Sequence, residues 1–267
     1  MIQAGGSTID YVETGSGPVL LFLPGSYSTP AAWRPIQKLL PAGYRMAGTS
    51  LCGYGATEDT RTPADSGIEH EVEIVARVAQ RLGDPIHLIG HSFGGTVALA
   101  AALSRRMEVA SLSLFEANPL ALLVGSALYN ETLAMSRGFK AAVDAGEADA
   151  PARIIDFWGG AGSFAAMPEA VRDYCRKTVG ANVIDWETDF GFLAGASDYA
   201  KLAMPVLLVR GALANPAMVA ITDVLADALP NARRAVVPGA GHFLVSSHPA
   251  QCASLLGSFL ANVTPRR

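Results

Sequence analysis

Short apolar runs recur along the chain and are separated by breaks rich in glycine and proline. A continuous run of this kind is typical of a strand buried on both faces, as in a parallel sheet. Val19–Leu23 is such a run, and further strands are predicted at Ile86–Ile89, Ser111–Phe115, Pro205–Val209 and Arg233–Val237, with a weaker strand at Tyr44–Thr49. An alternating segment, Thr8–Glu13, predicts an N-terminal β-hairpin arm that ends at the turn Gly15–Pro18.

Helical periodicity occupies most of the intervals between these strands. In the interval Ser66–Leu82, apolar residues recur at the spacing of one helical face. The segments that predict helices are Ala31–Leu40, Ser66–Leu82, Thr96–Leu103, Ala217–Leu229 and Pro249–Leu260. Strands alternating with helices indicate an α/β fold, with a mostly parallel sheet covered by helices on both faces.

The predicted alternation of strands and helices stops after Pro119. Residues 119–200 contain no convincing strand, and helix-like stretches at 121–145, 151–158 and 168–179 are separated by glycine-rich breaks. An insertion of roughly 80 residues is too long for an ordinary loop. We therefore predict a core formed by residues 1–118 and 201–267, with a helical cap at 119–200.

Composition excludes several classes of protein. Half of the 267 residues are hydrophobic, only 16% are charged and the net charge is -4, without a lysine or arginine run, so nucleic-acid binding is not expected. Three widely spaced cysteines favour reduced thiols in a cytoplasmic protein over disulfides or a metal cluster. The first residues lack the features of a signal peptide, and no apolar run reaches the ~18 residues of a membrane span.

The segment Gly90-His91-Ser92-Phe93-Gly94 fits the pattern G-x-S-x-G between a predicted strand and a predicted helix. In this arrangement the serine occupies a strained corner with its hydroxyl exposed, and glycines allow the strand and the helix to approach. The helix N-terminus favours negative charge beside the serine. The alternative is a glycine-rich turn with an incidental serine; the flanking elements favour a nucleophile.

A serine nucleophile needs a base, and His242 is the best candidate. It lies in the glycine-rich loop that follows the last predicted strand, from which a side chain can reach the sheet edge. The other histidines have plainer explanations in a turn, a strand, a helix and a helix start; they are His91, His87, His70 and His248.

These features together resemble the α/β-hydrolase fold superfamily. The matching segments are Leu23–Ser26, Gly53–Gly55, Gly90–Gly95, the break at Pro119, Pro205–Ala212 and Pro238–His242. The resemblance implies Ser92 as nucleophile, His242 as base, and the backbone N–H groups of Ser26 and Phe93 as an oxyanion hole. It implies no metal and no organic cofactor. Two positions depart from the family pattern: Pro24-Gly25 replaces His-Gly, and Ser50 replaces an aspartate.

The third catalytic residue is the largest departure. The family's usual acid position falls on Ala214 or Asn215, and neither is a carboxylate. Some members place the acid after the strand that follows the nucleophile helix, and that position is Glu116 here. The resemblance then implies the triad Ser92, His242 and Glu116. The alternative is that Glu116, which precedes Asn118-Pro119, only binds the backbone.

The resemblance implies a serine hydrolase that cleaves a carboxylic ester or lactone through an acyl-enzyme. The expected partner is a small, apolar substrate molecule; the oligomeric state is left open, with a homodimer as one option. A C–C bond (β-diketone type) hydrolase, an acyltransferase and a non-hydrolytic ligand-binding or lyase homologue remain alternatives. A serine nucleophile speaks against a dehalogenase or epoxide hydrolase, which use a carboxylate. Residues expected to line the pocket are Tyr27, Trp33, Leu120, Phe139, Trp158, Trp186, Asn215 and Phe243.

Overall fold

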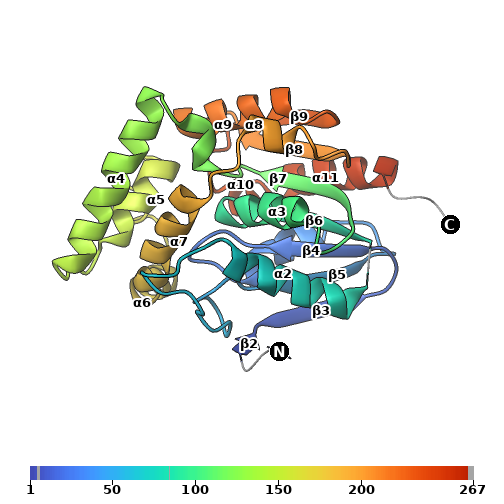
Figure 1. Cartoon of the computed structure of the whole chain (residues 1–267), viewed down its shortest axis with the longest axis horizontal. Coiled ribbons are helices and arrows are strands. Elements are labelled where there is room, and N and C mark those ends of the chain that lie inside the picture. The colour runs from blue at the N-terminus through green and yellow to red at the C-terminus, as the bar shows by residue number, and fades with distance from the viewer. Residues whose placement is uncertain (5–6, 84, 264–267) are drawn as a thin grey trace.

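The computed structural model describes residues 1–4, 7–83 and 85–263. A seven-stranded sheet has the order β3-β5-β4-β6-β7-β8-β9 (Figure 1). Its strands are β3 (Tyr11–Gly15), β4 (Val19–Leu23), β5 (Arg45–Thr49), β6 (Ile86–His91), β7 (Val109–Phe115), β8 (Val206–Gly211) and β9 (Ala232–Val237). Only β3 pairs antiparallel, with β5, and every other pairing in this sheet is parallel. The predicted α/β class is confirmed.

The N-terminal segment differs from the prediction. Thr8–Glu13 is divided at Asp10 into β2 (Ser7–Ile9), which pairs with β1 (Ile2–Ala4), and the edge strand β3. The backbone N–H of Asp10 donates to Thr57 Oγ1, and its carbonyl accepts from Thr49 Oγ1. Because side chains occupy both backbone groups of Asp10, the hydrogen-bond ladder cannot continue through it.

Each face of the sheet has its own core, and β4 shows the alternation. Leu21 and Leu23 pack with one set of helices, and Leu20 and Phe22 pack with another. The first face is covered by α2 (Glu69–Leu82), α3 (Phe93–Ser104) and α9 (Pro216–Ala228). The second is covered by the 3-10 helix η1 (Pro30–Trp33), α1 (Arg34–Gln37), α10 (Leu244–Ser247) and α11 (Pro249–Val263). Helices therefore lie on both faces, as predicted.

The helices between β7 and β8 are η2 (Leu120–Leu123), α4 (Ala127–Asp144), α5 (Pro151–Gly159), α6 (Glu169–Lys177), α7 (Val179–Gly191) and α8 (Ala196–Tyr199). Of these, α4, α5, α6 and α7 gather at one end of the sheet (left in Figure 1), whereas α8 packs against α9. The prediction missed α7 as a helix because its buried positions include Asn182, Asp185 and Asp189, which interrupt the apolar periodicity. The division of the chain into core and cap at 119 and 200 stays a prediction.

The structure shows the state of the three cysteines, and it bears on membrane spans and metal sites. Cys52, Cys175 and Cys252 are free and buried, and burial raises the pKa of the Cys175 thiol to about 11. Among the described residues, no helix is long and apolar enough to cross a membrane, and no group of three or more His, Cys, Asp or Glu residues is arranged to hold a metal ion.

Candidate active site

Ser92 occupies the sharp corner between β6 and α3. Its backbone has φ 53° and ψ -128°, a left-handed conformation that a residue with a side chain rarely adopts. The glycines on either side have a steric cause. A Cβ at Gly90 would lie 2.4 Å from the Gly94 carbonyl oxygen, and one at Gly94 would lie 2.2 Å from the Pro24 oxygen. The G-x-S-x-G pattern therefore reflects close backbone packing that holds the strained corner in place.

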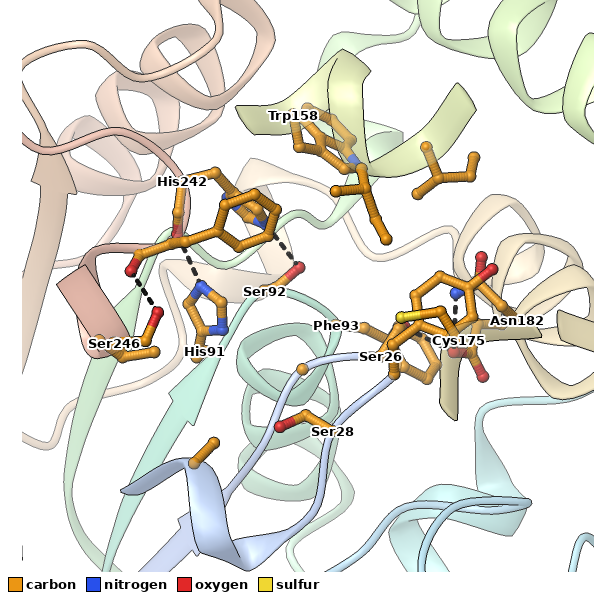
Figure 2. Close-up of a pocket in the computed structure, with 18 of the residues that line it drawn as sticks. Ser26, Ser28, His91, Ser92, Phe93, Trp158, Cys175, Asn182, His242 and Ser246 are labelled. Carbon is orange, nitrogen blue, oxygen red and sulfur yellow. Dashed lines mark hydrogen bonds between the residues drawn. The ribbon is translucent and has the colours of Figure 1, made fainter. Parts of the chain in front are cut away.

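Three side chains from distant parts of the sequence form a hydrogen-bonded chain. Ser92 Oγ lies 3.1 Å from His242 Nε2, and His242 Nδ1 lies 2.8 Å from Glu116 Oε2 (Figure 2 shows the first of these bonds). Ser92 follows β6, Glu116 follows β7 and His242 lies in the loop after β9. All three follow the carboxyl ends of parallel strands, where ligands gather in α/β sheets.

Glu116 bridges the ends of two neighbouring strands. Its backbone has φ 49°, its N–H donates to Val209 O, and its Oε1 accepts from the Gly211 N–H at 2.7 Å. Burial raises the pKa of the carboxyl, but the hydrogen bonds from His242 and Gly211 and the charge of His242 outweigh it and lower the pKa. The side chain is therefore a buried carboxylate that holds the Nδ1 proton of His242.

The position where the family usually carries its acid is occupied differently. Asn215 caps α9, because its side-chain oxygen accepts from the Ala217 N–H, and its Nδ2 donates to the Phe157 carbonyl. Glu116 instead reaches the His242 ring from the adjacent strand. The amide at 215 therefore has a structural place that does not involve the His242 ring.

His91 supports the His242 loop from below. Burial, and then the charge of His242, lower the pKa of His91 to about 3, so its ring is neutral. Its Nε2 lies 2.9 Å from the His242 carbonyl oxygen, which assigns the single ring proton to Nε2 as the donor. This is the structural role expected for a residue inside the turn. His87, His70 and His248 bond to Ser111, Thr60 and Ser247 respectively.

Ser26 and Phe93 lie beside Ser92. Both line the same cavity as Ser92, and Phe93 is the first residue of α3, where an N–H has no partner within the helix. Gly25 allows the Ser26 loop to approach, since a Cβ there would lie 3.1 Å from Ser92 Cβ. Tyr27 adds a further strained residue, with φ 58°. The Ser26 hydroxyl donates to Asp185 Oδ2 at 2.5 Å, which ties this loop to α7.

A cavity of about 430 Å³ opens onto Ser92 and His242. Of the aromatic residues predicted to line it, Tyr27, Trp158, Trp186 and Phe243 do so. Trp158 stacks on Trp186 with 6.1 Å between ring centroids, and it lies 5.6 Å from the His242 ring (Figure 2). Most of the remaining wall is apolar, including Ile154, Ile155, Met167, Val171 and Val245.

The other four predicted pocket residues lie elsewhere, and these expectations are corrected. Trp33 packs on the opposite face of the sheet against Phe22 and Phe115. Leu120 (η2) and Phe139 (α4) are fully buried in the core, and Phe139 borders a separate hollow between α4 and α7. Asn215 caps α9 instead.

The sequence reasoning missed a polar wall on the cavity. Asn118, Asn182, Asp185 and Asp189 line it, three of them from α7. Their spacing of three and four residues matches one helical face, which is the signal that could have found them. They were missed because polar residues on a predicted cap helix are ordinarily expected to face solvent.

Behind this wall lies a buried cluster of charges centred on Arg61. Its guanidinium lies 2.7 Å from Asp185, 3.1 Å from Glu71 and 3.0 Å from Asp59. Burial lowers the pKa of Arg61, but the surrounding carboxylates outweigh this and raise it, so the group stays charged. Asp185 also accepts from the Tyr54 hydroxyl at 2.6 Å.

Comparison with known proteins places the chain in a family. The model of the alpha/beta hydrolase family matches residues 20–255. The chain is 26% identical to a fluoroacetate dehalogenase from Burkholderia sp. (98% of this chain, 93% of the relative), and 26% identical to a pimeloyl-[acyl-carrier protein] methyl ester esterase from Aeromonas hydrophila (92% and 96%). A thermophilic esterase from Thermogutta terrifontis has the same fold at 21% identity, with a TM-score of 0.78 over 97% of this chain and 95% of that one. The chain belongs to the alpha/beta hydrolase family.

Proposed function

We propose that the protein is a serine hydrolase that cleaves a carboxylic ester or lactone through an acyl-enzyme. The observation that carries this proposal is the hydrogen-bonded chain Ser92–His242–Glu116 at the edge of a largely apolar cavity. A serine hydroxyl becomes nucleophilic when a positioned base removes its proton, and a buried carboxylate orients that base.

In the first half of the reaction, His242 Nε2 takes the proton of the Ser92 hydroxyl as Oγ attacks the acyl carbonyl. Glu116 holds the other ring proton at Nδ1 and stabilises the imidazolium that forms. His242 then gives its new proton to the leaving alkoxide. In the second half, water attacks the acyl-enzyme with His242 again as the base, which returns Ser92 and releases the acid.

Charge develops on the carbonyl oxygen at each tetrahedral intermediate. The backbone N–H groups of Ser26 and Phe93 are assigned to this oxyanion, because both residues adjoin Ser92 at the cavity. Donors fixed before the reaction stabilise the oxyanion without reorganising, and one such donor contributes about 10²–10³ in rate in a protease example. The strained backbone at Ser92 and Tyr27 belongs to this preorganisation.

Two features support an ester or lactone as the substrate. The cavity walls are mostly apolar around Trp158 and Phe243, which suits an uncharged acyl compound. One relative is a methyl ester esterase, and its ester bond is the kind of bond proposed here. The helices between β7 and β8 would then form the cap that closes the cavity.

The test is hydrolysis of p-nitrophenyl acetate and butyrate by the wild type beside Ser92→Ala. We expect turnover by the wild type, and a rate near background for Ser92→Ala, because only Ser92 can form the acyl-enzyme. A fluorophosphonate should label the wild type at Ser92, detected by mass spectrometry, and should not label the variant. A wild type that neither hydrolyses these esters nor takes the label would contradict the proposal and favour a ligand-binding homologue.

A further experiment separates hydrolysis from acyl transfer. Adding methanol to the butyrate assay leaves butyric acid as the main product if water is the natural acceptor. Predominant formation of methyl butyrate at low methanol concentration would point to an acyltransferase.

A further inference from the structure

One face of α7 turns a row of polar side chains toward the cavity. Asn182, Asp185, Trp186 and Asp189 all line it, and their spacing of three, four and seven residues is that of a single helical face. The three polar residues are at most 3% exposed. A helix that only packed against an apolar core would present apolar residues at these positions.

Three polar atoms in this region have no hydrogen-bond partner among the described residues: Tyr27 Oη, Asn182 Oδ1 and Asp189 Oδ1. All three residues line the same cavity. Buried polar groups are nearly always paired in native proteins, so unpaired ones need an explanation. A polar group of a bound molecule is one that could pair with them.

The hydrogen bonds already made by Asn182, Asp185 and Asp189 show which of their oxygen atoms have no partner. Asn182 Nδ2 points to Asp185 and Tyr54, which leaves its Oδ1 unpaired. Asp189 Oδ2 accepts from Asn118 Nδ2 at 2.8 Å, which leaves its Oδ1 unpaired. Asp185 is already occupied by Arg61, Ser26 and Tyr54, so its charge is neutralised within the protein.

Between them, the three groups can both donate and accept hydrogen bonds. Burial raises the pKa of the Asp189 carboxyl well above its ordinary value, and the charge of Asp185 adds to this, while the Leu120 N–H opposes it. This shift favours the protonated acid, which can donate a hydrogen bond. Tyr27 can donate or accept, and Asn182 Oδ1 can accept. Among the described residues that line the cavity, none is a lysine or an arginine.

We propose that Tyr27, Asn182 and Asp189 form a subsite for an uncharged substrate group that both donates and accepts hydrogen bonds, such as a secondary amide or a hydroxyl. A carboxylate is not expected there, because no lysine or arginine among the described lining residues is available to pair with it. The proposal rests on the proposed function, since it describes the substrate of that same site.

The subsite belongs to the acyl part of the substrate. His242 protonates the leaving group, so the leaving group lies on the His242 side of Ser92. Figure 2 shows Ser26 and Asn182 on the other side of Ser92 from His242. An acyl chain bound with its carbonyl oxygen at Ser26 and Phe93 therefore extends toward α7.

The experiment compares matched p-nitrophenyl esters. One series carries N-acetylated glycine, β-alanine, 4-aminobutanoate or 5-aminopentanoate as the acyl group, which varies the distance between the carbonyl carbon and the amide. The matched hydrocarbons are pentanoate, hexanoate, heptanoate and octanoate, and mono-p-nitrophenyl adipate supplies the anion. At the best spacer, we expect kcat/KM of the amide ester to exceed that of its hydrocarbon match about tenfold, and the adipate to be the poorest substrate.

Substitutions on α7 test which residues cause the preference for the amide esters. Asp189→Leu and Asn182→Leu remove hydrogen bonding at similar volume, and each should bring the amide-to-hydrocarbon ratio close to one. Asp189→Asn keeps a neutral hydrogen-bonding group and should keep most of the preference. Glu187→Gln is the matched control, because Glu187 lies on α7 but borders the other hollow. Each ratio is measured on one protein, so a general loss of folded enzyme cancels.

Two results would overturn the subsite. One is that no amide ester is preferred over its hydrocarbon match or over the adipate; the other is a ratio that Asp189→Leu and Asn182→Leu leave unchanged. If the wild type hydrolyses no ester, the proposed function fails, and binding decides the subsite separately. Saturation-transfer NMR with N-butylacetamide should then show binding to Ser92→Ala that weakens at least fivefold when Asp189→Leu is added. Equal binding to both proteins would contradict the subsite.

Discussion

Two buried glutamates, Glu71 and Glu116, have opposite charge preferences. Neither side chain is more than 1% exposed, and each lies beside a basic group. The pKa of Glu116 is lowered, whereas burial raises the pKa of Glu71 to about 7. Burial therefore does not decide the charge of a carboxyl group by itself.

The difference comes from the partners. Glu116 receives a hydrogen bond from His242 and another from the Gly211 N–H, and no other carboxylate among the described residues forms an ion pair with His242. Glu71 shares Arg61 with Asp185 and Asp59, and a single guanidinium cannot balance three carboxylates. An arginine also keeps its proton throughout, whereas a histidine can exchange one. The same residue type therefore pairs with a histidine in one cluster and with an arginine in the other.

The largest expected effect separates the two glutamates by activity. Glu116→Gln should lower kcat/KM for a p-nitrophenyl ester by about 10³–10⁴, because an amide can favour the wrong histidine tautomer. Glu71→Gln should remain within about threefold of the wild type, since Glu71 lies in the Arg61 cluster and does not contact Ser92 or His242, and an amide is close to a carboxyl group in shape. Steady-state kinetics at pH 7 measure both, and near-full activity of Glu116→Gln would remove Glu116 from the triad.

A second expected effect concerns stability in the Arg61 cluster. Arg61→Met leaves Asp185 buried without its cation and should lower the free energy of unfolding by about 3–5 kcal/mol. Urea denaturation measures this loss, with Arg77→Met, which removes an exposed ion pair to Glu73, as the control expected to lose less than about 1 kcal/mol. If Arg61→Met does not fold, Arg61→Lys should fold with a smaller loss. Equal stabilities of all three variants would mean that the cluster contributes nothing.

The third prediction uses pH. The folded-state pKa of Glu116 lies below the ordinary value of 4.5, so its contribution is present above pH 4.5 and is lost as the pH falls through the folded-state pKa. The folded-state pKa of Glu71 lies above 4.5, so the folded protein holds its proton longer and stability falls as the pH rises from 4.5 to about 7. Denaturation of the wild type, Glu116→Gln and Glu71→Gln across pH 3–8 tests both signs. Stability differences with the same pH slope for both variants would contradict the comparison.

The smallest expected effect tests the link between the two clusters. Ser26 joins them, because its hydroxyl bonds Asp185 while its N–H is assigned to the oxyanion. Ser26→Ala removes the hydroxyl and keeps the N–H, so we expect kcat to fall about three- to tenfold with KM nearly unchanged, from the loss of one hydrogen bond of roughly 1 kcal/mol that holds the loop. The exposed Ser258→Ala on α11 serves as the control. A change in KM alone would instead place the Ser26 hydroxyl in substrate binding.

Much of the fold could be predicted from local pattern. The strands β4, β6 and β8 were expected because both of their faces are buried, so their apolar runs are nearly continuous. The edge strand β9 is largely exposed. The break at Asp10 was not expected, because Thr49 and Thr57, far away in sequence, occupy its backbone groups. Helix α7 was missed because its buried face pairs polar groups with Arg61, Asn118 and Ser26.

The candidate triad followed from a resemblance, and its geometry did not. The sequence identified Ser92 by the turn that it requires, and it placed Glu116 and His242 at the ends of strands. It did not show that the Gly211 N–H would hold Glu116 against the His242 ring, nor that Asn215 would cap a helix. Pocket residues were predicted least well, because lining a cavity depends on how helices from an insertion pack, as Trp33 and Phe139 illustrate.

The sequence by itself determined the α/β alternation and the nucleophile corner, because both depend on interactions between neighbouring residues: apolar periodicity, and glycines that permit a strained turn. Only the tertiary structure decided the charge states of Glu71, Glu116 and Asp189 and the polar wall of the cavity. These depend on which groups from distant segments share a buried space, and electrostatic and hydrogen-bond energies in such a space change strongly over a few ångströms.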